Sequence, residues 1–84
     1  MATEEQKFLE GLIKRLVNKP DKVKISRTVN EKGVLLTVKV DPEDVGILIG
    51  KQGRHIKEIR QLVRLIGLKN KAFVSVRLEQ PVQP

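Results

Sequence analysis

The sequence contains no cysteine and a single histidine, His55. Without a thiol, the chain can form neither a disulfide framework nor a thiolate metal site, and it has no cysteine nucleophile. One imidazole also falls short of the set that a multi-histidine metal centre requires. We therefore expect neither a metal nor another cofactor.

Aromatic residues are scarce, since the chain has no Trp or Tyr and only two Phe, Phe8 and Phe73. Folds that stack nucleobases on an aromatic platform, such as RRM, OB and cold-shock domains, are therefore excluded. No apolar run approaches the roughly 20 residues of a membrane span, and the N-terminal segment lacks the apolar stretch of a signal peptide. The resulting prediction is a cytoplasmic location without a membrane partner.

Positive charge is in excess and unevenly distributed. The formal net charge is +7, from 17 basic and 10 acidic residues. Residues 51–71 hold seven Lys or Arg against one acid, Glu58, so nearly the whole excess lies in one quarter of the chain. This concentration is typical of a surface that binds a polyanion, although a solvated helix face would carry the same charges.

The length of 84 residues predicts one small domain, spanning residues 1–80, with a flexible tail at residues 81–84. Thr3 can cap a first helix that ends before Pro20. Its apolar stripe consists of Phe8, Leu9, Leu12, Ile13, Leu16 and Val17. Residues 22–29 and 34–40 alternate apolar and polar side chains around the turn "NEKG", which predicts an antiparallel hairpin.

The segment "DPED" opens a short second helix, with Asp41 as its cap and with Glu43 and Asp44 near the positive end of its dipole. A third helix is predicted from Arg54 to Ile66, with Gly67 as its C-terminal cap. Its apolar arc consists of Ile56, Ile59, Leu62, Val63 and Ile66. Residues 72–79 then form a last strand.

This order of helix, strand, strand, helix, helix and strand predicts an α+β fold. The last two strands are joined by a helical crossover, so they should run parallel, whereas the first strand pairs antiparallel. Three helices should cover one face of a three-stranded mixed sheet.

The stretch "ILIGKQGRHIKEIR" contains two glycines between apolar helical segments. It fails the P-loop pattern, because only three residues separate Gly46 from Gly50 and because Gln52 replaces the Mg²⁺-binding hydroxyl. It fails the dinucleotide fingerprint as well, since position 48 is Leu. The remaining pattern is I-G-x-x-G-x-x-I, from Ile49 to Ile56.

This pattern resembles the KH domain, in which a GXXG loop between two helices clamps a nucleic-acid backbone. The element order over residues 4–79 is similar to type II KH domains. The short chain, "DPEDVG" and "IGKQGR" also resemble the stand-alone bacterial KH proteins of the KhpA type. The resemblance implies a small RNA-binding protein that often associates with a larger Jag-type KH partner. Two departures are Ile47, where a polar or basic residue is expected, and His55, where a small or apolar one is usual.

The predicted RNA-binding residues comprise the loop, its flanking isoleucines and a basic stripe on the third helix. They are Ile49, Gly50, Lys51, Gln52, Gly53, Arg54, Ile56, Lys57, Arg60 and Arg64. Steps of 100° per residue place Lys57, Arg60 and Arg64 within a 60° arc, so the stripe continues from the loop. Glycines would let the loop approach a sugar-phosphate backbone, and amides at the start of the helix would add partial positive charge.

Several alternatives stay open at the level of sequence. The two glycines can serve a tight turn alone, Gln52 can be an exposed residue without a fixed contact, and Ile49 and Ile56 can belong to the core. His55 falls on the apolar side of its helix, which favours partial burial or a partner surface over contact with a ligand.

Two classes of function fit these features. The first is a non-catalytic module that binds single-stranded RNA, with RNA favoured over DNA by the resemblance alone. The second is a protein interaction domain that forms a homodimer or docks on a larger Jag-type KH protein. An enzyme is not predicted, because no acid-base pair is apparent and the few Ser and Thr lie far in sequence from His55.

Overall fold

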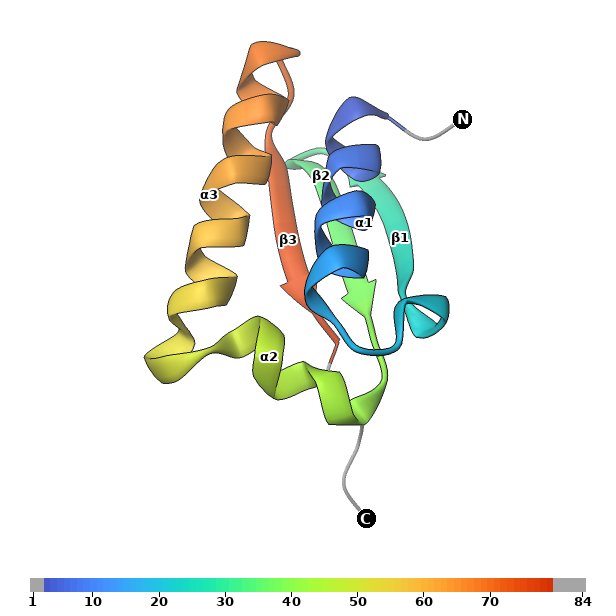
Figure 1. Cartoon of the computed structure of the whole chain (residues 1–84). Helices are drawn as coiled ribbons and strands as arrows, with labels where there is room; N and C mark the ends of the chain where they lie inside the picture. Colours follow the sequence, from blue (N-terminus) through green and yellow to red (C-terminus); the bar gives the residue numbers. More distant parts are fainter. Residues whose placement is uncertain (1–2, 80–84) are drawn as a thin grey trace.

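The computed structural model describes residues 3–79, and its helices and strands follow the predicted order (Figure 1). The helices are α1 (Glu4–Leu16), α2 (Val45–Ile49) and α3 (Arg54–Lys69), and the strands are β1 (Lys24–Asn30), β2 (Gly33–Lys39) and β3 (Val74–Leu78). Short 3-10 turns are η1 (Pro20–Lys22), η2 (Pro42–Asp44) and η3 (Lys51–Gly53). The predicted tail, residues 81–84, lies outside the described residues.

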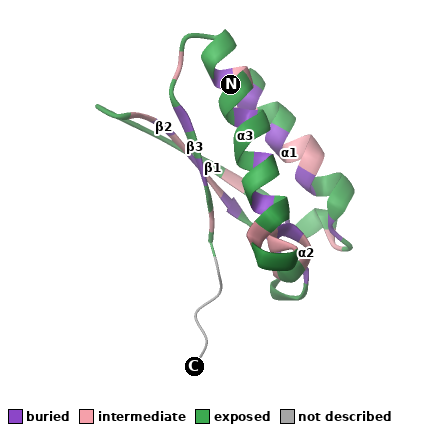
Figure 2. Cartoon of the chain, turned by 90° about the vertical axis from the view of Figure 1, so that its left-hand side faces the viewer, coloured by how far each residue is buried: buried purple, intermediate pink, exposed green. Residues whose placement is uncertain are grey.

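The sheet has the order β1-β2-β3, with β1 antiparallel and β3 parallel to β2. This confirms the predicted α+β class and the mixed sheet, because the crossover through α2 and α3 returns the chain in the direction of β2. The helices lie on one side of the sheet, with α2 toward its lower end (Figures 1 and 2). Within residues 3–79, no helix has the length and apolar character needed to cross a bilayer.

The core lies between the sheet and the pair formed by α1 and α3. Buried and more exposed side chains alternate along β2 and β3 as predicted, because every second side chain points toward the helices. Fully buried side chains come from α1, β2, α2 and α3, namely Leu9, Ile13, Leu36, Val38, Leu48 and Val63. The two long helices are thereby held against one face of the sheet.

Several apolar side chains are more exposed than their sequence patterns suggest. Val29 is 59% exposed, because β1 is an edge strand and its end extends beyond the helices (Figure 2). Leu62 is 47% exposed, although the helical pattern assigns it to the core-facing arc of α3. Leu16 at the end of α1 is exposed as well. The apolar stripes of α1 and α3 are thus wider than the surface that the sheet covers.

Gly67 does not end the third helix, so the predicted C-terminal cap is wrong. The helix continues to Lys69, and its capping residue is Asn70. Gly67 is buried, and a Cβ there would lie 2.5 Å from Cγ2 of Val74 at the start of β3. The glycine therefore permits close packing of α3 on β3, a contact that local sequence patterns do not encode.

Candidate nucleic-acid interface

The acidic segment before α2 fixes the position of this helix, which leads into the glycine loop. Asp41 caps η2 as predicted, since its carboxylate accepts a hydrogen bond from the Glu43 amide at 2.9 Å. Asp44 differs from the prediction, because it is 1% exposed and its carboxylate accepts from the amides of Asn18 and Lys19. The carboxylate of Asp44 therefore anchors α2 to the segment that follows α1, instead of capping α2 itself.

The loop between α2 and α3 has an unusual backbone. Gly50 has φ +71° and ψ −175°, and Gly53 has φ +74° and ψ 16°. Gln52 between them has φ 56°, a left-handed conformation that costs a non-glycine residue roughly 1–2 kcal/mol. The Gly50 angles lie in a region essentially restricted to glycine, and the Gly53 angles lie in the left-handed region that glycine adopts without strain. Together they turn the chain from α2 into α3.

The polar residues of the loop and the first turns of α3 surround a surface hollow of about 260 Å³. It is lined by Lys51, Gln52, Arg54, Lys57, Glu58 and Gln61. The three cations are exposed, and they outnumber the single carboxylate of Glu58. The structure thus brings four of the predicted site residues together around one positively charged depression.

The other predicted site residues do not line this hollow. Ile49 is half-buried, whereas Ile56 is only 8% exposed, which leaves it little surface for contact with a base. Arg60 donates from Nε to the carbonyl oxygen of Val76 at 3.0 Å, so its side chain is directed toward the edge strand β3. Arg64 is exposed one turn further along α3.

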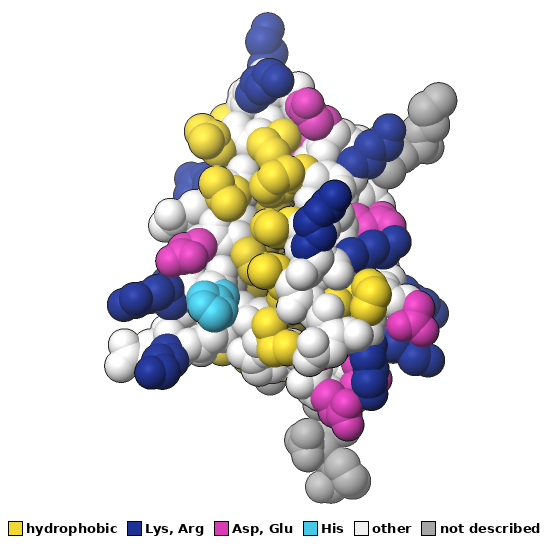
Figure 3. Space-filling view, in the orientation of Figure 1, with side chains coloured by type: hydrophobic (Ala, Val, Ile, Leu, Met, Phe, Trp, Pro, Cys, Tyr) yellow, Lys and Arg dark blue, Asp and Glu magenta, His cyan; other side chains and the backbone are white. Residues whose placement is uncertain are grey.

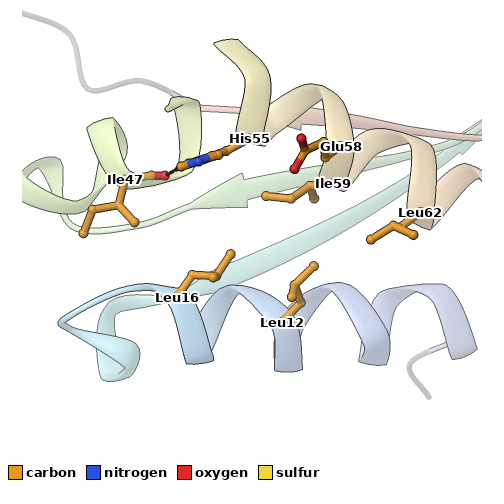
Figure 4. A pocket seen from close by; sticks show the side chains of 7 residues that line it. All are labelled: Leu12, Leu16, Ile47, His55, Glu58, Ile59 and Leu62. Carbon is orange, nitrogen blue, oxygen red and sulfur yellow. Dashed lines mark hydrogen bonds between the residues drawn. The ribbon is translucent and has the colours of Figure 1, made fainter. Parts of the chain in front are cut away.

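His55 makes contacts that the sequence does not reveal. Its Nδ1 lies 2.9 Å from the carbonyl oxygen of Ile47 in α2, eight residues earlier (Figure 4). Its ring also lies against Gly50, since a Cβ at that glycine would be 2.5 Å from Nδ1. The only sequence signal for this role is the departure at position 55 from the small or apolar residue that the KH resemblance leads one to expect.

An apolar groove of about 260 Å³ runs between α1 and α3 on the side of His55 that faces away from the charged hollow (Figures 3 and 4). Its walls are formed by Leu12, Leu16, Ile47, His55, Glu58, Ile59 and Leu62. Further exposed apolar side chains continue along the same helices, with Phe8 one turn before Leu12 and Leu65 one turn after Leu62. A band of hydrophobic side chains is therefore open to solvent (Figure 3).

The loop geometry suits binding of an anion. Gly53 has open space around its Cα, the first amides of α3 carry the positive end of a helix dipole, and Lys51, Arg54 and Lys57 supply full charges. Among residues 3–79, no cluster of three His, Cys, Asp or Glu side chains could hold a metal ion. The mixed sheet, the three helices on one side and the glycine loop between α2 and α3 define a KH domain of type II.

Residues 6–79 match the family described as KhpA/KhpB, KH domain, so the chain belongs to this family. It is 40% identical over 73 residues to the RNA-binding protein KhpA of Clostridium acetobutylicum, covering 87% of this chain and 97% of that protein. It is 41% identical over 62 residues to the RNA-binding protein KhpA of Aquifex aeolicus, covering 74% and 78% of the two chains. The RNA-binding protein KhpA of Streptomyces coelicolor is 37% identical over 62 residues, with the same coverage of both chains.

Proposed function

We propose that this protein binds single-stranded RNA without catalysis and that its GXXG loop clamps the phosphate backbone. The observation that carries the proposal is the hollow lined by Lys51, Arg54 and Lys57, which adjoins the turn that contains Gly50 and Gly53. The names of the relatives, which describe RNA-binding proteins, support RNA as the ligand. Such a protein would act in RNA metabolism or regulation in the cytoplasm.

In this mechanism the phosphates bind beside residues 50–53, where the missing Cβ of Gly53 leaves open space for close approach. Lys51 and Arg54 neutralise the nearest phosphates, and Lys57 extends the positive surface onto α3. Ile49 offers an apolar contact for a base, whereas the buried side chain of Ile56 packs inside the domain and helps to hold α3 in place. Arg60 and Arg64 bind the backbone further along α3.

The test is the double substitution Lys51→Asp with Gln52→Asp, which keeps both glycines and places two carboxylates at the expected phosphate position. Both side chains are exposed, so stability should change by about 0.5 kcal/mol or less. RNA affinity should fall at least about tenfold, or roughly 1.4 kcal/mol, because attraction becomes like-charge repulsion. The measurements are an anisotropy titration with labelled single-stranded RNA and a thermal melt.

The chain offers a control with the same two residue types. Gln6→Asp with Lys7→Asp makes an identical change of charge in the first turn of α1, at the opposite end of the molecule from the loop (Figure 1). This variant should lose only the small affinity that follows from lower net charge. Equal affinities for the loop variant, the control and the unchanged protein would refute the clamp.

A second function, docking on another KH chain, is favoured by the apolar groove between α1 and α3. Groove residue Leu62 is 47% exposed, and Leu65 beside it is 65% exposed. Burial of such side chains against a partner is favourable by roughly 25 cal/mol per Å² of apolar area. We propose a homodimer or a heterodimer with a larger Jag-type KH protein, in which two RNA clamps act together and raise the effective concentration of each.

A further inference from the structure

His55 is placed where three parts of the proposed RNA site meet. It lies in the first turn of α3, its Nδ1 is 2.9 Å from the carbonyl oxygen of Ile47 in α2, and its ring lies against Gly50 (Figure 4). A carbonyl oxygen only accepts hydrogen bonds, so Nδ1 must carry the proton in this contact. One side chain therefore joins the end of α2, the first glycine of the loop and the start of α3.

The loop needs such a restraint because of its composition. Glycine can adopt many backbone conformations, and Gly50 and Gly53 occupy ones that other residues avoid. Gln52 is held in a left-handed conformation as well. A loop that had to become ordered during binding would lose affinity, whereas a loop ordered beforehand would not.

The contact with Gly50 is close enough to restrain the loop sterically. A Cβ on Gly50 would lie 2.5 Å from both Cγ and Nδ1 of His55 and 2.9 Å from Cδ2, so the imidazole fills the space beside the glycine. The hydrogen bond to Ile47 fixes the orientation of the ring in that space. Together the two contacts limit the direction in which the chain can leave α2.

We propose that His55 is a positioning residue that holds the loop of residues 50–53 in its RNA-binding conformation, through its Nδ1–H bond to Ile47 and its packing on Gly50. This inference rests on the proposed RNA-binding function and assigns a role to a residue outside the charged hollow. The imidazole acts through the loop and not by contacting the phosphates itself.

Four substitutions separate positioning from charge and from bulk. His55→Ala removes both contacts, and His55→Gln carries its amide nitrogen one bond too far from the backbone. His55→Asn places its amide nitrogen at the same number of bonds from Cα as Nδ1, so it can donate to Ile47. His55→Lys adds a positive charge without a donor at the Nδ1 position.

Affinity for a labelled single-stranded RNA should fall about three- to tenfold in the Ala and Gln variants, the range expected for one net hydrogen bond. The Asn variant keeps the donor to Ile47 but lacks the ring on Gly50, so it should bind more tightly than the Ala and Gln variants and less tightly than the unchanged protein. Thr28→Ala on the distant, exposed strand β1 serves as the control and should bind normally. Restored binding by Lys and not by Asn would overturn the proposal in favour of a role for charge.

A second measurement examines the loop without RNA. In ¹⁵N-correlated NMR spectra, the amide signals of Gly50 and Gly53 should broaden in the Ala and Gln variants and broaden less in the Asn variant. Line widths are compared and not positions, because loss of the imidazole ring current moves the Gly50 signal in every variant. Equally sharp glycine signals in all variants would overturn the proposal. If Lys51→Asp with Gln52→Asp left RNA affinity intact, the proposed function would fail, while the spectra would still decide whether His55 orders the loop.

Discussion

Replacement of each of three glycines near the loop by alanine tests two energetic costs, that of backbone conformation and that of steric contact. Gly46 lies in α2 with a helical backbone, and an added Cβ would meet no atom within 4 Å. Gly53 has φ +74° but equally open space around its Cα. Gly50 combines φ +71° with the His55 ring at 2.5 Å. Gly46 thus has neither unfavourable feature, Gly53 has a strained backbone alone, and Gly50 has a still more restricted backbone together with the steric contact.

The expected changes in the free energy of unfolding follow from these features. Gly46→Ala should stabilise the protein by roughly 0.5–1 kcal/mol, because alanine is the better helix former. Gly53→Ala should destabilise it by roughly 1–2 kcal/mol, since an L-residue is strained in the left-handed region. Gly50→Ala should cost at least about 1 kcal/mol more than Gly53→Ala, because its backbone region is essentially restricted to glycine and because the His55 ring must move and lose its hydrogen bond to Ile47.

Thermal unfolding followed by circular dichroism measures these differences. For a domain of this size, 1 kcal/mol corresponds to roughly 4–8 °C in Tm, so the three variants should be well resolved. Adding His55→Ala to Gly50→Ala should cost less than His55→Ala alone, because the contact is already broken. Equal melting temperatures for Gly50→Ala and Gly53→Ala would refute the reasoning, since neither the more restricted backbone of Gly50 nor its contact with His55 would then carry a cost.

Three further predictions concern binding to RNA and association with a partner chain. If about three or four phosphates are neutralised, the logarithm of RNA affinity should fall with the logarithm of salt concentration at a slope of about −2 to −3, and a slope near zero would contradict an electrostatic clamp. Arg64→Ala should make the slope less steep without changing the base preference, which a salt series on several RNA sequences would check. For association, Leu62→Glu with Leu65→Glu should abolish the concentration-dependent sedimentation expected of the unchanged protein, whereas Gln61→Glu on the same helix should preserve it. A monomer at every concentration, together with no binding to a Jag-type KH protein, would rule out the docking function.

The order of helices and strands could be predicted from the sequence because it depends on local patterns. The 3.6-residue spacing of apolar side chains marks α1 and α3, and alternation marks the strands. The loop was also predictable, since the backbone at Gly50 and Gly53 needs φ values that glycine adopts most readily. The parallel pairing of β3 followed from a connectivity rule.

The roles of individual side chains were decided by tertiary packing. The helical pattern places Ile56 and Leu62 on the same arc of α3, yet Ile56 is buried and Leu62 is 47% exposed, because only part of that arc faces the sheet and α1. The sequence pattern predicts that Gly67 ends the helix, but the missing Cβ of this glycine instead makes room for the side chain of Val74.

Residues far apart in the chain account for the other differences. Asp44 binds amides 25 and 26 residues away, Arg60 donates to the Val76 carbonyl, and the His55 ring lies against Gly50 while bonding to Ile47. Periodicity specifies which face of an element is apolar, but it does not specify which atoms of another element that face will meet. Those contacts depend on the distances and angles between packed elements, which only the folded chain defines.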